Sequence, residues 1–253
     1  MIAAPPRLPQ GFRLLAYDRL GSSNDEAKLL ARDGAAEWTI VWTREQTAGR
    51  GRRGRQFIGV PGNLYVSIIL RPDCLPAAAA QLGFVAALGV GDALEALAPP
   101  ETVLRYKWPN DVLLNGNKVA GILLESEMTS CGTVDWLVAG VGVNVEGHPG
   151  ETAYPATSLR AEGFAAVSAA MVLEAFAPAF RHWTDRWRRE GFAPIRAQWL
   201  RGAVGRGETV TVQLDRDRFD GCFADLDGDG ALLVETPAGR RRVAAGDVFP
   251  ARG

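Results

Sequence analysis

The pattern of apolar and polar positions along the chain predicts a mixture of strands and helices. Short apolar or alternating runs bounded by glycine, proline, asparagine or aspartate are typical of strands, and apolar residues recurring every three or four positions are typical of helices. Strands are expected over residues 12–17, 38–43, 64–70, 103–108, 111–114, 119–125 and 134–145. Helices are expected from Ser23, where Glu26 completes a capping box, and over residues 76–97 and 167–187. This mixed order favours an α+β fold.

The pattern changes after Trp199. Short alternating strands separated by Asp-, Gly- and Pro-containing turns are expected over residues 209–214, 219–226, 231–235 and 241–244. They predict a small β-barrel that begins near residue 203. The aspartates of this segment lack the spacing of an EF-hand calcium loop, so they are interpreted as solvated turn residues.

Composition narrows the class of protein. The formal net charge is −1, so no overall field attracts nucleic acid or an anionic membrane. Three cysteines without C-x-x-C spacing favour a reducing cytoplasm over a disulfide framework. The first residues do not resemble a signal peptide, and the longest apolar stretch, residues 84–98, is interrupted by glycine and acidic residues. The chain is therefore expected to be cytoplasmic, without a membrane partner.

Lysine is rare in this chain. Only Lys28, Lys107 and Lys118 are lysines among the 28 basic residues, and the others are arginines. A lysine therefore hints at a position where a compact ammonium group is wanted rather than a planar guanidinium.

The densest chemical signal is residues 46–55, which read QTAGRGRRGR. Glycines spread among arginines predict a mobile loop whose guanidinium and backbone N–H groups can surround an anion. A solvated basic loop or a nucleic-acid-binding patch would have the same composition. The loop alone leaves its ligand open.

Three further segments carry polar groups or glycines at strand positions. Residues 107–111 read KWPND, in which the proline fixes a kink at a strand end, a favoured place for ligand contacts. Residues 118–125 open with a lysine and have a glycine inside the strand, and residues 140–145 contain two more glycines. A glycine inside a strand often marks the close approach of a ligand. The spacing of residues 140–145 is not that of a dinucleotide-binding fingerprint.

In this order, with Ser22, Ser23 and Asn24 before them and a small β-domain after them, these segments resemble the biotin protein ligase family over nearly the whole chain. The family's usual Ser-Thr-Asn is Ser-Ser-Asn here, which keeps the second hydroxyl. The resemblance implies an α+β fold. Residues 1–202 would form a mixed sheet with flanking helices, of the class II synthetase type, and residues 203–253 an SH3-like β-barrel.

The resemblance also implies a function. The chain is expected to activate biotin with ATP and Mg²⁺ to biotinyl-5′-AMP, and to transfer biotin to a lysine of a biotin carboxyl carrier protein. The residues expected to carry the chemistry are Arg52, Lys107 and Lys118. Those expected to bind biotin are Ser22, Ser23, Asn24, Gln46, Arg50, Gly51, Arg52, Lys118, Gly121, Gly140 and Gly142. Those expected to bind ATP are Arg50, Arg52, Lys107, Trp108, Asn110, Asp111, Lys118 and Asn144, with Asp111 also holding Mg²⁺.

Three rival interpretations stay open at this point. A lipoate protein ligase shares the fold, although the arginine-rich loop and the KWPND segment favour biotin. The chain could also be a nucleic-acid-binding module or an inactive carrier-binding protein, and a homodimer is left open. Some family members carry an N-terminal DNA-binding domain, but too few residues precede the first expected strand, so no nucleic-acid partner is expected. Tyr154 is the candidate for covering adenine, because residues 146–154 contain no tryptophan.

Overall fold

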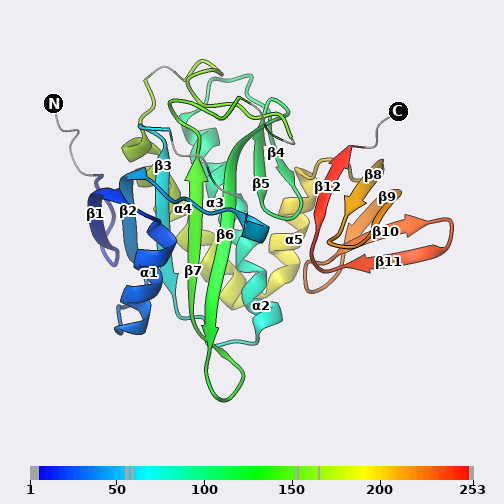
Figure 1. The fold of residues 1–253 in the computed structure, drawn as a ribbon, viewed down its shortest axis with the longest axis horizontal. Coiled ribbons are helices and arrows are strands. Elements are labelled where there is room, and N and C mark those ends of the chain that lie inside the picture. Colours follow the sequence, from blue (N-terminus) through cyan, green and yellow to red (C-terminus); the bar gives the residue numbers. More distant parts are fainter. Residues whose placement is uncertain are drawn as a thin grey trace.

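The computed structural model describes residues 6–54, 57, 60–150, 152, 154–164 and 166–250. Its largest element is a mixed sheet of seven strands, shown in Figure 1. In spatial order the strands are β1 (Arg13–Leu20), β2 (Thr39–Gln46), β3 (Leu64–Leu70), β7 (Val134–Val143), β6 (Asn117–Met128), β5 (Asp111–Leu114) and β4 (Leu104–Lys107). Only β1 and β2 pair in parallel, and every other neighbouring pair is antiparallel. The predicted mixed sheet is confirmed.

Helices cover both faces of this sheet, because its strands alternate apolar side chains between the two sides. On β3, Leu64, Val66 and Ile68 belong to the large core that lies under the helices of one face, whereas Ile69 packs on the other side with Ala27 of α1. Figure 1 shows α1 (Ser23–Arg32) in front of the sheet and α3 and α4 behind it. The helices of the rear layer are α2 (Pro76–Ala80), α3 (Leu82–Leu97), α4 (Ala169–Glu190) and α5 (Phe192–Arg201).

The predicted helix over residues 76–97 is two helices that meet at Gln81. By length and composition the stretch Pro76–Leu97 could cross a membrane, but 78% of its most apolar window is buried inside the protein. It is therefore the core helix layer of this fold. The sequence pattern does not predict helix α5.

The start of α1 corrects a sequence prediction. The N-terminal cap is Ser22, whose hydroxyl accepts a hydrogen bond from the backbone N–H of Asp25, and not Ser23. Ser23 and Asn24 form the first turn and are only 4% and 5% exposed. Moving the cap by one residue leaves the side chains of Ser23 and Asn24 available for contacts across the sheet.

A second, five-stranded antiparallel sheet follows α5 and is called here the C-terminal sheet. Its strands are β8 (Thr209–Gln213), β9 (Arg218–Leu226), β10 (Leu232–Thr236), β11 (Gly239–Val243) and β12 (Asp247–Pro250), in the order β11-β10-β9-β8-β12. The small SH3-like β-unit is thus confirmed, although the sequence pattern does not predict strand β12. Its apolar residues, such as Phe223 and Leu232, belong to the same core as Trp199 of α5. The two sheets therefore pack against one continuous apolar interior.

Candidate active site

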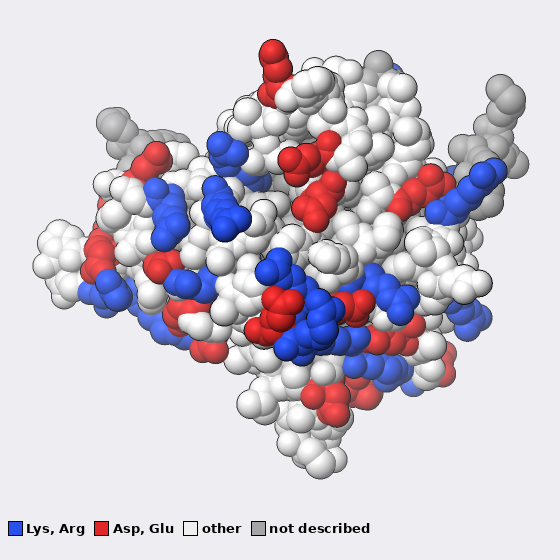
Figure 2. Space-filling view, turned by 180° about the vertical axis from the view of Figure 1, so that it is seen from behind, with Lys and Arg blue, Asp and Glu red and all other residues white. Residues whose placement is uncertain are grey.

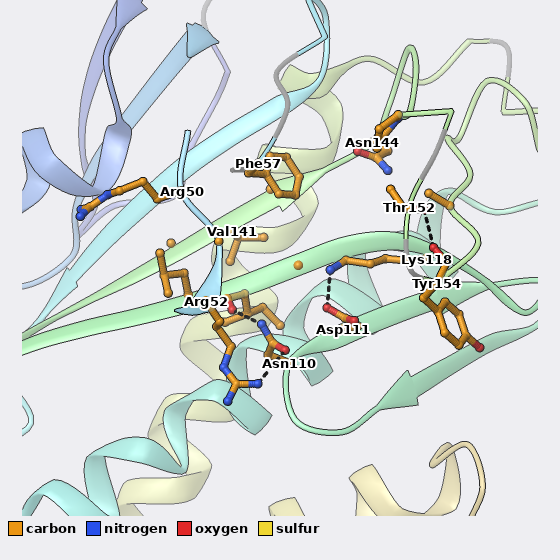
Figure 3. Close-up of a pocket in the computed structure, with 18 of the residues that line it drawn as sticks. Arg50, Arg52, Phe57, Asn110, Asp111, Lys118, Val141, Asn144, Thr152 and Tyr154 are labelled. Atoms are coloured by element: carbon orange, nitrogen blue, oxygen red, sulfur yellow. Dashed lines mark hydrogen bonds and ion pairs between the residues drawn. The ribbon is translucent and has the colours of Figure 1, made fainter. Parts of the chain in front are cut away.

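A cavity of about 380 Å³ opens on the α1 side of the large sheet. It is of a size typical of small-molecule sites, and Figure 3 shows the side chains that line it. They come from α1, from the loop after β2, from β4 to β7, from residues 149–156 and from β12. The C-terminal sheet therefore supplies part of the wall.

The cavity gathers the predicted site residues from segments far apart in the chain. The expected residues that line it are Ser22, Ser23, Asn24, Gln46, Arg50, Gly51, Arg52, Lys107, Asn110, Asp111, Lys118, Gly121, Gly140, Gly142 and Asn144. Tyr154 lines it as well. Trp108 does not. Its ring is 2% exposed and packs in the core, where Nε1 donates a hydrogen bond of 3.1 Å to the carbonyl of Gly230. Trp108 therefore joins the two sheets, and the expectation that it contacts ATP is not supported.

One end of the cavity is a buried polar cluster. The backbone N–H and the hydroxyl of Ser23 lie 2.8 and 3.1 Å from Oε1 of Gln46. The Ser67 hydroxyl, which is fully buried, lies 2.8 Å from the Ser23 hydroxyl and 2.6 Å from Oδ1 of Asn24. Because each group has a defined partner, the side chains of this cluster are held in fixed orientations.

The glycines of β6 and β7 make room in the floor of the cavity. A Cβ atom added to Gly140 would lie 2.1 Å from Oδ1 of Asn24, and one added to Gly142 would lie 2.7 Å from the ring of Phe57. Gly121 pairs with Gly142 on the neighbouring strand and lies under the ammonium group of Lys118. The sequence predicts that these glycines leave room for ligand; in this structure that room holds Asn24 and Phe57.

The other end of the cavity carries two ammonium groups that share one carboxylate. Nζ of Lys118 lies 2.6 Å from Oδ1 of Asp111, and Nζ of Lys107 lies 3.5 Å from Oδ2. Lys107 is 6% exposed, and burial lowers its pKa; the Asp111 carboxylate opposes this shift and the neighbouring Lys118 adds to it. The arrangement concentrates positive charge where an anion can reach it.

Aromatic rings surround Lys107. Its Nζ lies 5.0 Å from the ring centre of Tyr154 and 5.2 Å from that of Phe249, which comes from β12. Near this end, Asn144 donates to the carbonyl of Thr157, whereas its buried Oδ1 has no hydrogen-bond partner among the described residues. A buried acceptor without a partner indicates a place for a ligand donor.

The arginines of the glycine-rich loop point in different directions, as Figure 3 shows. The guanidinium group of Arg50 is bound to Asp25 of α1 and to Glu125 of β6. Arg52 reaches Oδ1 of Asn110 at 3.4 Å and the carbonyl of Gly246 at 3.3 Å. The loop is thus attached both to α1 and to the C-terminal sheet. Residues 55, 56, 58 and 59 lie outside the residues that the structure describes, so the last residue of the predicted loop, residue 55, is not among them.

The donor set bears on the expected Mg²⁺ ion. Within the described residues no three His, Cys, Asp or Glu side chains gather to hold a metal. Two carboxylates, Asp111 and Asp247, line the cavity, and Asp111 is already ion-paired with two lysines. Mg²⁺ is often held by one or two carboxylates together with substrate phosphates. The residues fit an ion carried by a triphosphate, and not a site built by the protein alone.

Several lining residues are not predicted from the sequence. Phe57 lies in the segment between β2 and β3 that the pattern predicts as a polar loop, and Asp247 and Phe249 lie in a strand that the pattern does not reveal. Ser67 belongs to a strand that reads as uniformly buried, so nothing in the sequence marks its hydroxyl as a partner of Asn24. Side chains alternate between the two faces of a strand, so Ser67 lies on the same face of β3 as Ile69, which packs on the α1 side.

The face of the molecule on the side of α3 and α4 carries charges of both signs. Figure 2 shows the face opposite to that of Figure 1, where basic and acidic side chains are interleaved. Pairs such as Arg188 with Glu37, and Arg186 with Glu190, account for this pattern on and beside α4. This face lacks the field of one sign that nucleic acid requires.

Residues 59–201 match the biotin/lipoate A/B protein ligase family, and residues 206–249 match the biotin protein ligase C terminal domain. The chain is 44% identical to a biotin--[acetyl-CoA-carboxylase] ligase of Paracoccus denitrificans, over 91% of this chain and 98% of the relative. It is 33% identical to the bifunctional ligase/repressor BirA of Bacillus subtilis, over 94% of this chain and 74% of the relative. Its structure resembles a biotin protein ligase from Aquifex aeolicus in complex with biotin and ATP, with a TM-score of 0.79 and 26% identity, over 95% of this chain and 99% of that chain.

Proposed function

The chain belongs to the biotin protein ligases of the biotin/lipoate A/B protein ligase family, and from this premise we propose that it activates biotin with ATP and transfers the biotinyl group to a lysine of a biotin carboxyl carrier protein. One observation carries the proposal. Arg52, Lys107 and Lys118, from three separate segments, line the same cavity as the polar cluster around Asn24. A small polar ring and a set of phosphates can therefore be held side by side.

The polar cluster suits the ureido ring of biotin. The hydroxyl and amide groups of Ser22, Ser23, Asn24 and Gln46 supply both donors and acceptors to such a ring. The ammonium group of Lys118 lies over Gly121, within reach of the cavity floor, and is assigned to the biotin carboxylate and the α-phosphate. This assignment explains why one cavity combines a neutral end with a cationic end.

The nucleotide is assigned to the cationic end. Lys107, Asn110 and Asp111 lie there, and Tyr154 and Phe249 provide aromatic surface beside Lys107. The unpartnered Oδ1 of Asn144 needs a donor, and the amino group of adenine is a donor of this kind. We assign Asn144 to that contact.

Adenylation needs no general base at this site. The biotin carboxylate is ionised at neutral pH, so its oxygen attacks the α-phosphorus directly while the bond to pyrophosphate breaks and pyrophosphate leaves. The obstacle is the approach of an anion to a polyanion. Fixed cations, here Lys107, Lys118 and Arg52, stabilise the negative charge that the phosphoryl oxygens carry in the transition state. His148 and His182 do not line the cavity, in agreement with an adenylation step that requires no proton acceptor.

Transfer requires the intermediate to be kept from water. Biotinyl-5′-AMP is a mixed anhydride. The neutral amine of the carrier lysine attacks its acyl carbon, the bond from the acyl carbon to the phosphate oxygen breaks, AMP leaves, and the proton of the amine is released to solvent. The loop that carries Arg50, Gly51 and Arg52 borders the cavity and is fastened to both α1 and the C-terminal sheet. We assign to this loop the role of shielding the anhydride from water. Positioning of the lysine then contributes most, with a ceiling of about 7–11 kcal/mol.

When bound, Mg²⁺ neutralises part of the triphosphate charge. Asp111 is the residue assigned to assist it, and its ion pairs with Lys107 and Lys118 support a role beside the phosphates rather than in a metal cage. An Asp111→Asn variant that needs no more Mg²⁺ than the wild type for half-maximal adenylation would remove Asp111 from this role.

The experiment that tests the function is incubation with ATP, Mg²⁺ and either biotin or lipoate, followed by mass detection of the acyl-adenylate. We expect biotinyl-5′-AMP and pyrophosphate, and a biotinylated lysine after a biotin carboxyl carrier domain is added. Formation of the lipoyl-adenylate in preference to the biotinyl-adenylate would support a lipoate ligase. No adenylate with either acid would overturn the proposal.

Three further expectations stay predictions. Residues 1–202 and 203–253 are proposed as the catalytic and C-terminal domains. The protein is proposed to work in the cytoplasm, where its three free cysteines would stay reduced. Light scattering on the purified protein, with and without biotin and ATP, decides whether it forms a homodimer.

A further inference from the structure

The side-chain amide of Asn24 has almost all of its hydrogen-bonding capacity in use. Its nitrogen donates to Oε2 of Glu125 at 2.8 Å and to the carbonyl of Leu123 at 3.4 Å, and its oxygen accepts from the Ser67 hydroxyl at 2.6 Å. A carboxylate only accepts hydrogen bonds, so the atom of Asn24 that faces Glu125 must be the nitrogen. The amide therefore has one orientation, and its spare capacity is one lone pair on Oδ1.

Glu125 is well placed to impose this orientation. Its carboxylate is 2.8 Å from Nζ of Lys28 and 3.1 Å from a guanidinium nitrogen of Arg50, so two cations compensate its charge. Glu125 does not line the cavity, whereas Asn24 does. It can affect a ligand through the two cavity residues that it holds, the amide of Asn24 and the guanidinium of Arg50. Of these two groups only the amide can present either a donor or an acceptor.

The oxygen of Asn24 lies on the cavity side of this arrangement. A Cβ on Gly140 would meet it at 2.1 Å, and Gly140 is part of the cavity floor. Gln46 has the opposite polarity, because its Oε1 accepts from both the N–H and the hydroxyl of Ser23, which leaves its Nε2 as the donor. The cluster thus offers an acceptor at Asn24 and a donor at Gln46. A cyclic urea offers the complementary N–H and carbonyl.

We propose that Glu125 is a positioning residue that sets substrate selection by holding the Asn24 amide with its oxygen toward the ring site. The inference rests on the proposed function and names how that site selects its acid. A ring with an N–H opposite Asn24 is accepted. A ring with an oxygen or a sulfur at that place meets an acceptor and leaves the second lone pair of Asn24 Oδ1 without a donor.

The test compares biotin with the two carbamate analogues in which one or the other ureido N–H is replaced by a ring oxygen. The readout is the ratio of kcat/KM for adenylate formation with biotin to that with each analogue. The wild type should reject one analogue by on the order of 10- to 100-fold. In Glu125→Met the amide can rotate and offer its nitrogen to the ring oxygen, so this ratio should fall by roughly tenfold. Glu125→Gln keeps an acceptor for Asn24 and should restore most of the ratio.

Lys28→Met is the matched control, because it removes a cation beside Glu125 but leaves the contact between Glu125 and Asn24. Its ratio should equal that of the wild type. A merely structural role for Glu125 would lower kcat/KM for biotin and for both analogues equally, and an unchanged ratio in Glu125→Met would overturn the proposal.

A second pair of variants tests the same inference even if the Glu125→Met variant does not fold. Asn24→Asp places two carboxylates together and should lose biotin activation. Asn24→Asp combined with Glu125→Gln lets the glutamine amide donate to the new carboxylate, which still presents an oxygen to the ring. The double variant should regain both activity and preference for biotin. A double variant no better than Asn24→Asp alone would contradict the inference, whereas a wild type that does not adenylate biotin would instead refute the proposed function.

Discussion

Nζ of Lys118 on β6 lies 2.6 Å from Oδ1 of Asp111 on β5, and the same carboxylate faces Nζ of Lys107 at 3.5 Å. Asp111 thus holds the two ammonium groups near each other. Without it, like charges would repel at a site where Lys107 is nearly buried.

Asp111→Asn should therefore destabilise the protein. Because the change leaves a buried ammonium group uncompensated, we expect the free energy of unfolding to fall by about 3 kcal/mol. ATP should stabilise the variant more than the wild type, since its phosphates supply the missing negative charge. Denaturant unfolding and thermal shift with and without ATP measure both effects. Asp135→Asn is the control, because it removes one partner of a partly exposed ion pair with Arg71 and should change the free energy of unfolding little. Equal losses of stability in the two variants would contradict a stabilising role of Asp111 beside the two lysines.

Lys118→Ala should abolish most adenylate formation, because the charge that faces the α-phosphate is gone. We expect a loss of about 100-fold or more in kcat for pyrophosphate release, the size typical of removing one electrostatic contact to a transition state. Lys118→Arg, which keeps the charge but changes its shape, should retain more activity. Unchanged pyrophosphate release in Lys118→Ala would rule out the assigned role.

Arg52→Gly should let the adenylate escape. The Arg52 guanidinium joins the loop to Asn110 and to the carbonyl of Gly246, so its loss should open the cavity to water and to foreign amines. The measurement is biotin labelling of a bystander protein such as serum albumin, which should rise well above the wild-type level. Arg53→Gly is the control, because it removes one positive charge at a residue that does not line the cavity. It should label the bystander protein less than Arg52→Gly does. Slow but strictly carrier-specific labelling by Arg52→Gly would refute the shielding role.

The lowered pKa of Lys107 predicts a pH dependence. Its usual value is 10.5, and burial makes the folded protein release this proton at a lower pH. As the pH rises, the cation is lost earlier than from an exposed lysine, so kcat/KM for ATP should decline before pH 10.5 is reached. Lys107→Arg keeps its charge over this whole range, and its alkaline limb should move to higher pH. Superimposable alkaline limbs would show that Lys107 does not govern the profile.

Trp108→Phe should affect stability rather than nucleotide binding. The substitution leaves the buried carbonyl of Gly230 without its donor, at a cost of about 1–3 kcal/mol in the free energy of unfolding. Trp108 lies in the core and not in the cavity. The substitution should therefore change packing alone, and KM for ATP should stay within about twofold of the wild-type value. A large rise in KM for ATP at unchanged stability would show instead that Trp108 contacts ATP.

The sequence predicted most of the fold because its strands and helices carry strong periodic patterns. Strands β3 and β5 begin and end where expected, and the change in pattern near residue 203 marks the C-terminal sheet. Helix α5 and strand β12 are not predictable in this way. Strand β12 is only four residues long and contains Pro250, so its pairing with β8, rather than its own pattern, makes it a strand.

The site was predictable where side-chain chemistry is concentrated in short motifs. Lysines, glycines and the arginine-rich loop are visible as such, and the structure brings them to one cavity. What the sequence could not show is which groups are partners. Whether Arg50 faces a ligand or Glu125, and whether Gly140 leaves space for a ligand or for Asn24, depends on contacts between strands far apart in the chain. The burial of Trp108 was hidden for the same reason, since a motif does not reveal on which side of a strand its ring packs.

The position of strand β12 at the end of the chain has a consequence for when the cavity is completed during synthesis. It follows every other wall of the cavity along the chain, so a polypeptide still leaving the ribosome can fold its large sheet before Asp247 and Phe249 are in place. Until then the cationic end stays open to solvent, and any anhydride formed there would be lost. Because both sheets supply walls of the same cavity, the two should be inherited as a unit.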